Sequence, residues 1–300
     1  AADYAVVNLE TTLSGTDGGK EYTGFPNFNS PDGIALSAET AGFDMLLTAN
    51  NHCHDRGKHG LERTAHLLDS LQIPFLGTYR TPEDRQQRYP LLIEKNGFRI
   101  ALLAYTYDTN GLRPSEPNIV NYIDTIQIKG DIQAARQMKP DAIIACMHWG
   151  LEYHSLPNYS QKKLADWLID QGVDHVIGTH PHVVQPMEVR PSKHHPSRHL
   201  IVYSLGNFIS NMSRENTDGG AMVKLELKKL WGITRMENCS YSLIWTSRPI
   251  SGKKTSYEVY PASFITKPIK YEEFTPFKRF LDNTRTLYYK HNKGIKEYFF

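Results

Sequence analysis

Short apolar runs alternate with helical segments from the start of the chain to about residue 210. Residues 43–49 and 141–147 are nearly continuous apolar runs, which is typical of buried strands. Residues 61–71 instead repeat their apolar side chains at helical spacing. Because strands and helices follow one another, we predict an α/β fold in which helices cover a sheet. Further strands are expected at residues 5–7, 73–77, 91–94, 98–105, 174–178 and 199–205, and further helices at residues 31–41, 131–138 and 161–171.

Turn and cap residues mark several element boundaries. Ser30 followed by Pro31 is the pattern of a helix N-cap and first helical position, and Gly42 fits the end of that helix. Asn96-Gly97 separates two expected strands and is the strongest short hairpin signal. Since a hairpin adds antiparallel pairing, we expect mixed sheets.

The pattern changes after about residue 215, where apolar and polar positions alternate as in half-exposed strands. We expect the whole of residues 1–300 to be one domain. Residues 1–210 are its motif-bearing core, and residues 211–300 complete it with strands and a C-terminal helix. The expected elements of this last part are strands at residues 221–228, 235–245 and 256–260 and a helix at residues 272–289.

The composition excludes several classes of protein. Of the 300 residues, 40% are hydrophobic, which is a globular rather than a disordered composition. The formal net charge is only +2, so we do not expect nucleic acid as a partner. Cys53, Cys146 and Cys239 are too few for a disulfide framework or a four-thiolate zinc site. We expect Cys53 and Cys146 to be small buried apolar residues.

Five of the expected strands end in histidine, asparagine or a carboxylate. In α/β sheets, ligands bind beyond the carboxyl ends of the strands, so we expect these side chains to gather at one rim. The side chains in question are Asn8, Glu10, Asn50, Asn51, His52, His148, Glu152, His180, His182 and Asn207.

Such a mixed nitrogen and oxygen donor set suits one or two divalent ions of the Mn, Fe or Zn class. It fits a hydrolytic centre better than a structural zinc site, which prefers thiolates. A two-metal centre stabilises both the attacking and the leaving oxygen of a phosphoryl transfer. His52 lies beside Asn51 and is not needed as a ligand, so it is the candidate general acid.

Each piece alone also has an ordinary structural interpretation. His148 fits a core histidine bonded to the backbone, and residues 50–52 fit a turn. Glu10 fits a surface carboxylate, and Asn207 fits a turn residue after Gly206. The combination of all these residues favours metal binding.

The order of these motifs resembles a known family over residues 5–210. The matching segments are residues 8–11, 41–44, 49–52, 55–57, 60–61, 73–77, 96–97, 148–153, 178–185 and 203–208. With them the chain resembles the bacterial capsule-synthesis CapA (PgsA-like, poly-γ-glutamate) proteins, a branch of the calcineurin-like metallophosphoesterase superfamily. The resemblance implies a four-layer α/β/β/α sandwich of the metallo-dependent phosphatase type with mixed sheets.

The resemblance also implies roles for single residues. Asn51 is a metal ligand and His52 the general acid, while His148 binds the same metal as Asn51. His180 and His182 each serve one metal, and Glu10 takes the place of the bridging aspartate. Residues that then support the ligands or contact substrate are Asn8, Asn50, Asp55, Glu152 and Asn207.

The chain departs from the superfamily pattern at three places. Asn50 stands where glycine is usual, and Thr179 is inserted in the closing motif. The first aspartate motif would precede residue 1, so we expect this sequence to be a fragment of a longer protein. The resemblance implies an extracytoplasmic domain, anchored to the membrane through a segment outside these residues.

Three functions stay open at this point. The first is a metal-dependent hydrolase acting on phosphate esters or a related anionic bond. The second is a non-catalytic component of a membrane capsule-synthesis complex that binds an anionic polymer. The third is a γ-glutamyl hydrolase using the same metal centre. An ordinary solvated loop is the favoured interpretation of one basic segment, which would otherwise be the polymer contact. Its basic residues are Lys193, His194, His195, Arg198 and His199.

Overall fold

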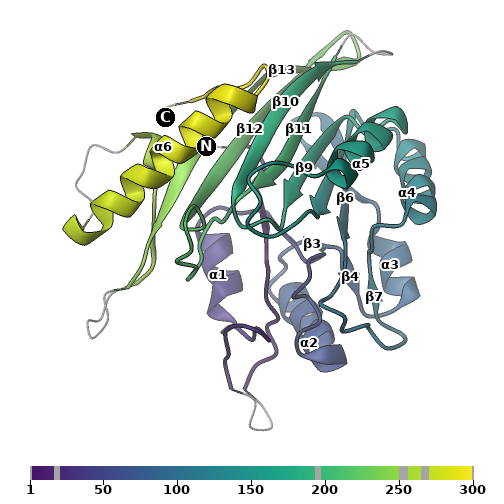
Figure 1. Ribbon diagram of the computed structural model, residues 1–300. Coiled ribbons are helices and arrows are strands. Elements are labelled where there is room, and N and C mark those ends of the chain that lie inside the picture. Colours follow the sequence, from purple (N-terminus) through teal and green to yellow (C-terminus); the bar gives the residue numbers. More distant parts are fainter. Residues whose placement is uncertain (1, 17–20, 193–196, 250–255, 265–269, 299–300) are drawn as a thin grey trace. The chain divides into compact units, whose positions relative to one another are not determined.

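The computed structural model describes residues 2–16, 21–192, 197–249, 256–264 and 270–298. The chain forms two compact units, and Figure 1 labels their helices and strands. The first unit contains residues 1–148 and 171–173, and the second contains residues 149–170 and 174–300. In the described residues, no helix is both long and apolar enough to span a bilayer. Lys193, His194 and His195 of the basic loop lie outside the described residues.

The first unit contains a small parallel sheet covered by two helices. Its strands are β1 (Val6–Asn8), β2 (Met45–Leu47) and β3 (Phe75–Leu76), paired in that order. The helices are α1 (Gly33–Thr40) and α2 (Gly57–Ser70). The core that joins them consists of Leu9, Leu13, Ala35, Leu46, Ala65, Leu68, Ile73 and Phe75. This packing fixes the position of β2 and therefore the place where the residues after it begin.

A second sheet of the first unit carries the hairpin predicted at Asn96-Gly97. Both residues have positive φ, 50° and 78°, as the tight hairpin turn requires. The turn joins β5 (Leu91–Lys95) to β6 (Phe98–Thr106), and β6 pairs in parallel with β8 (Ala142–His148). The remaining elements of the unit are β4 (Thr78–Tyr79), α3 (Pro82–Arg88), β7 (Ile119–Val120) and α4 (Thr125–Gln137).

The second unit joins two groups of strands and a long helix around one core. One group has β11 (Arg198–Leu205) between the parallel β9 (His175–Thr179) and the antiparallel β10 (Val184–Pro191). The other pairs β12 (Gly219–Leu230) and β14 (Glu258–Tyr260) with β13 (Ile233–Ser247), which also pairs in parallel with β15 (Lys296–Glu297). The helices are α5 (Tyr159–Asp170), α6 (Phe274–His291) and the short 3₁₀ turns η1 (Ala262–Phe264) and η2 (Tyr271–Glu273).

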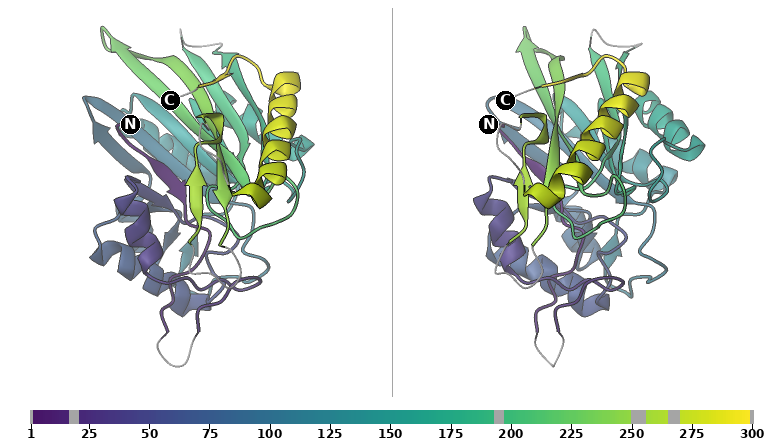
Figure 2. Two further views of the ribbon diagram at one scale, coloured as in Figure 1. Left: turned by 90° about the vertical axis from the view of Figure 1, so that its left-hand side faces the viewer. Right: turned by 60° about the vertical axis from the view of Figure 1, so that its left-hand side comes forward.

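Helix α6, yellow in Figure 2, closes the core of the second unit. Phe277 and Phe280 from α6 pack with Trp245 of β13, with ring centroids 5.6 and 5.7 Å from the indole. Met187 of β10 and Val202 of β11 belong to the same cluster. The long alternating strands predicted for this part of the chain therefore bury one face against the helix.

The predicted α/β class with mixed sheets is confirmed. The single domain and the four-layer stacking stay predictions, and several boundaries were wrong. Ser30 is not an N-cap, because α1 begins at Gly33 and the Ser30 hydroxyl pairs with Thr11 Oγ1 at 2.9 Å. Helices α2 and α4 begin earlier than predicted, and α3, β4, β7 and β10 were not predicted.

Candidate metal centre

The first unit brings an amide, an imidazole and a carboxylate together. Asn51 follows β2 and His148 ends β8, and their exposed fractions are only 1% and 2%. His148 Nε2 lies 2.8 Å from Asn51 Oδ1 and 3.6 Å from Glu10 Oε1. The Tyr107 ring stacks on His148 with 14° between the planes. Three of the predicted ligands therefore meet inside one unit.

The two distances measured from His148 Nε2 are compatible with a shared cation. Donors about 2.1 Å from one ion lie about 3.0 Å apart at right angles and about 3.4 Å apart at the tetrahedral angle. The distances from His148 Nε2, 2.8 and 3.6 Å, bracket these values. Imidazole nitrogen, amide oxygen and carboxylate oxygen are also the donor types that Zn, Fe and Mn accept. The residues present therefore fit the metal that the sequence predicts.

Asn50 stands where the pattern described above has glycine. Its side chain links, by hydrogen bonds, the segments that follow β1 and β2. Its Nδ2 donates to Asn8 Oδ1 at 3.1 Å and to the Leu9 carbonyl at 2.8 Å, and its Oδ1 accepts from the His52 amide. Asn8 Nδ2 in turn donates to Glu10 Oε2 at 3.0 Å. The predicted supporting residues Asn8 and Asn50 thus hold the segments that carry Glu10 and His52.

His52 forms a buried pair with Asp55. Its Nδ1–H donates to Asp55 Oδ2 at 2.7 Å, and the Phe28 ring meets the imidazole edge to face at 4.4 Å. The Phe28 amide donates to the same Asp55 oxygen at 2.7 Å. Because Nδ1 is engaged by the carboxylate, Nε2 is the ring nitrogen left for proton transfer to a substrate.

Sequence reasoning missed Asn110, which contacts the candidate ligand Asn51. Asn51 Nδ2 donates to Asn110 Oδ1 at 3.1 Å, and this bond fixes which way the Asn51 amide is turned. Asn110 and Gly111 have φ of 51° and 76°, and the Leu112 amide donates to the Thr109 carbonyl. The Asn-Gly dipeptide was the available signal for this turn.

The second unit holds His180 and His182 in unusual backbone conformations. Their φ values are +99° and +60°, and the nearby Tyr153 has φ of +65°. Strained non-glycine residues cluster at functional sites, because the surrounding structure must hold them in place. The Tyr153 amide donates to the Pro181 carbonyl at 2.8 Å, and its ring stacks on His182. The surrounding structure therefore holds the His-Pro-His segment in place, and its role as a source of metal ligands stays a prediction.

Asn207 supports His182, as its place in the predicted set suggests. His182 Nδ1–H donates to Asn207 Oδ1 at 3.0 Å, which leaves Nε2 as the nitrogen with a lone pair. Glu152 is different, because it is exposed and no hydrogen bond or ion pair joins it to another described residue. Its role in contacting substrate stays a prediction.

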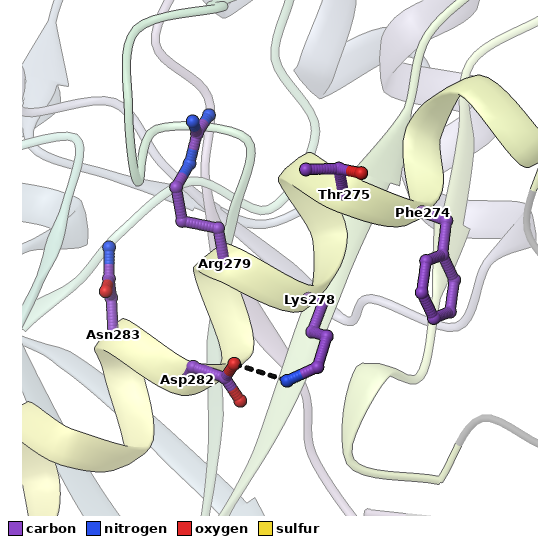
Figure 3. Close-up of a pocket in the computed structure, with 6 residues that line it drawn as sticks. All are labelled: Phe274, Thr275, Lys278, Arg279, Asp282 and Asn283. Carbon is purple, nitrogen blue, oxygen red and sulfur yellow. Dashed lines mark hydrogen bonds and ion pairs between the residues drawn. The ribbon is translucent and has the colours of Figure 1, made fainter.

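The cysteines and the pocket on helix α6 do not belong to the candidate site. Burial raises the pKa of both the Cys53 and the Cys146 thiol to about 12, so both stay protonated at neutral pH, and the expectation that they are buried apolar residues is confirmed. A depression of about 340 Å³ lies along α6 (Figure 3). It contains no predicted site residue, and its Lys278 pairs with Asp282 at 2.6 Å.

The α/β fold, with buried histidine and asparagine donors and a half-buried carboxylate, defines a candidate metalloprotein. The family of the bacterial capsule synthesis protein PGA_cap matches residues 1–212. The chain belongs to this family.

Two curated relatives are CapA proteins. The chain is 28% identical to the PGA biosynthesis protein CapA of Bacillus subtilis (strain 168), over 76% of this chain and 59% of that protein. It is 29% identical to the capsule biosynthesis protein CapA of Bacillus anthracis, over 64% of this chain and 46% of that protein. The chain thus spans about half the length of the curated relatives it matches.

Solved structures show only distant similarity. The NAD nucleotidase NadN of Haemophilus influenzae is 14% identical with a TM-score of 0.46, covering 89% of this chain and 50% of that one. The sulfate thiohydrolase SoxB of Thermus thermophilus is 16% identical with a TM-score of 0.44, covering 85% and 39%. At these scores the similarity supports no conclusion about this chain.

Proposed function

We propose that this chain is a metal-dependent hydrolase domain that acts in capsule biosynthesis. The substrate would be a phosphate ester or a related anionic bond. The observation that carries the proposal is the approach of His148 Nε2 to Asn51 Oδ1 and Glu10 Oε1, at 2.8 and 3.6 Å, beside the His52–Asp55 pair.

In this proposal, Glu10, Asn51 and His148 hold a divalent metal of the Mn, Fe or Zn class. The family resemblance adds His180 and His182 as further ligands, for one or two ions in all. A bound divalent cation would supply Lewis-acid charge that stabilises negative charge developing on an anionic substrate.

His52 acts as the general acid. Its Nδ1–H is held by Asp55 at 2.7 Å, so the ring is oriented and Nε2–H is available to the leaving oxygen. Phe28 packs against the ring and shields this pair from water, since His52 and Asp55 are both buried. The Asp55 carboxylate also stabilises the charged imidazolium by direct hydrogen bonding.

The names of the relatives suggest the biological setting. The curated relatives are named for PGA and capsule biosynthesis, so an anionic polymer of the capsule is the proposed substrate or partner. A membrane capsule-synthesis complex is the proposed place of action. The alternative function is non-catalytic binding of the polymer on the same fold.

Turnover assays test this proposal. The full chain, reconstituted with Mn, Fe or Zn, is assayed on a phosphate monoester, a phosphodiester and a γ-glutamyl peptide. We expect metal-dependent turnover of at least one substrate, lowered at least a hundredfold in His52→Ala, since general acid catalysis contributes about 10²–10⁴-fold. His291→Ala is the matched control, because His291 is exposed at the end of α6.

The same assays separate the enzyme from the polymer-binding alternative. Turnover that persists in His52→Ala contradicts the assigned acid. A protein that binds metal and polymer but turns over none of the three substrates supports the binding role.

A further inference from the structure

An arginine of the second unit lies over an aromatic ring next to the candidate ligand His182. The guanidinium carbon of Arg214 is 4.2 Å from the centre of the Tyr153 ring. Tyr153 in turn stacks on His182, with ring centroids 6.1 Å apart and 29° between the planes. Tyr153 therefore contacts both Arg214 and His182, which belongs to the His-Pro-His segment.

A chain of hydrogen bonds also connects Arg214 to His182. The Arg214 carbonyl accepts from both the amide and the hydroxyl of Thr217, at 3.1 and 2.7 Å. The Thr217 carbonyl accepts from Asn207 Nδ2 at 2.7 Å, and Asn207 Oδ1 accepts from His182 Nδ1. The backbone at Arg214 is thus linked to the His182 imidazole through Thr217 and Asn207, while its guanidinium lies over the Tyr153 ring.

The charge of Arg214 is not used within the described part of the chain. Its guanidinium makes no hydrogen bond or ion pair with a described residue, and its side chain is exposed. Glu215, the next residue, accepts a hydrogen bond from Asn283 Nδ2 on its Oε1 at 3.1 Å. Asn283 projects from α6 in Figure 3 and also donates to Asn216 Oδ1. A guanidinium that is held in place, and whose N–H donors have no partner within the described residues, can bind an anion.

We infer that Arg214, stacked on Tyr153, binds an oxyanion of the substrate, a carboxylate or a phosphate, at the tyrosine ring that also contacts His182. The planar guanidinium donates two parallel N–H bonds to such a group, and the tyrosine ring keeps the fork in one orientation. The inference rests on the proposed function, because it takes the surroundings of His182 as a substrate site. It adds the residue that selects for acidic substrates.

Direct binding tests the inference without relying on turnover. Isothermal titration of the full chain uses two probes, inorganic phosphate and a short γ-linked glutamate oligomer, with and without chelator. We expect Arg214→Gln to weaken binding of at least one probe about tenfold or more, the loss typical of a charge-assisted bidentate contact. The probe whose affinity depends on Arg214 identifies the source of the oxyanion.

Matched variants separate a specific contact from general charge effects. Arg235→Gln removes the same charge from an exposed position on β13 and should bind within about twofold of wild type. Tyr153→Leu removes the aromatic ring and should lose affinity as Arg214→Gln does. Arg214→Lys should fall between wild type and Arg214→Gln, because it keeps the charge and loses the fork.

Other outcomes overturn the inference. Equal affinity of wild type and Arg214→Gln for both probes would contradict it. Equal losses of affinity in Arg214→Gln and Arg235→Gln would also contradict it, and so would a wild-type protein that binds neither probe. Dependence on Arg214 that persists in chelator, in a protein without turnover, would uphold this site while the proposed hydrolase function fails.

Discussion

At the level of single residues, sequence reasoning proposed the donors and several of the residues that support them, but it missed Asn110 and Arg214. His148 and Asn51 meet at 2.8 Å although 97 positions separate them, and both were predicted because each follows an apolar strand. Asn110 was missed, because an Asn-Gly dipeptide predicts only a turn. Arg214 was missed as well, since a cation–π contact leaves no periodic signal in the sequence.

The His52–Asp55 pair gives a first prediction at this scale. Asp55→Asn keeps the size of the side chain and removes the charge that orients the imidazole. We expect kcat to fall about a hundredfold or more while KM and metal content stay unchanged. Steady-state kinetics with metal analysis measures this, and Asp282→Asn on the surface of α6 is the control. Unchanged kcat would contradict the role assigned to Asp55.

Buried His175 gives a second prediction, for stability against pH. Burial, with a smaller contribution from His199, lowers its pKa from 6.5 to about 3, and its Nδ1 accepts from the Leu200 amide at 3.1 Å. Between about pH 6.5 and 3 the unfolded state therefore binds a proton that the folded state does not. This group's contribution is fully present above pH 6.5, and it falls by up to about 1.4 kcal/mol per unit of acidification in that window.

His175→Asn is the variant that isolates this contribution. Asparagine Oδ1 can accept the Leu200 amide hydrogen bond and does not titrate. The free energy of unfolding, measured in urea from pH 7 to pH 4, should fall less steeply in the variant than in wild type. Parallel pH profiles for the two proteins would contradict the assignment.

At the level of elements, apolar patterns predicted most of the strands, whereas elements rich in polar residues such as α3 and β10 were missed. Helix α3 has no buried residue, so its sequence offers no periodic apolar stripe. Its cap was nevertheless readable, because Thr81 precedes Pro82 and accepts from the Asp84 amide. Strand β10 was missed, since it carries Gln185, Glu188 and Arg190 among its apolar residues.

Helix α4 gives a prediction at this scale, because its true start was missed. Asp124 caps it, with Oδ1 accepting from the amides of Ile126 and Gln127 at 2.7 and 3.1 Å. Asp124→Ala should lower the free energy of unfolding by about 1 kcal/mol, and Asp124→Asn should change it little. Denaturant unfolding of both variants measures this. Equal losses in the two variants would show that the cap is not what Asp124 contributes.

At the level of the whole molecule, family membership and motif order agree over most of the chain. The family matches residues 1–212, and the motifs that carry the resemblance lie within residues 5–210. The two compact units could not be predicted, because residues 149–170 and 171–173 belong to different units and no composition change marks the division.

Metal content tests the central claim most directly. The full chain is loaded with Mn, Fe or Zn, dialysed and analysed by plasma mass spectrometry, with circular dichroism to confirm folding. We predict stoichiometric metal in wild type and in His291→Ala, and loss of metal in His148→Ala and in His148→Asn, which keeps a buried polar group. Wild-type protein without metal, or equal metal in wild type and both His148 variants, would contradict the account.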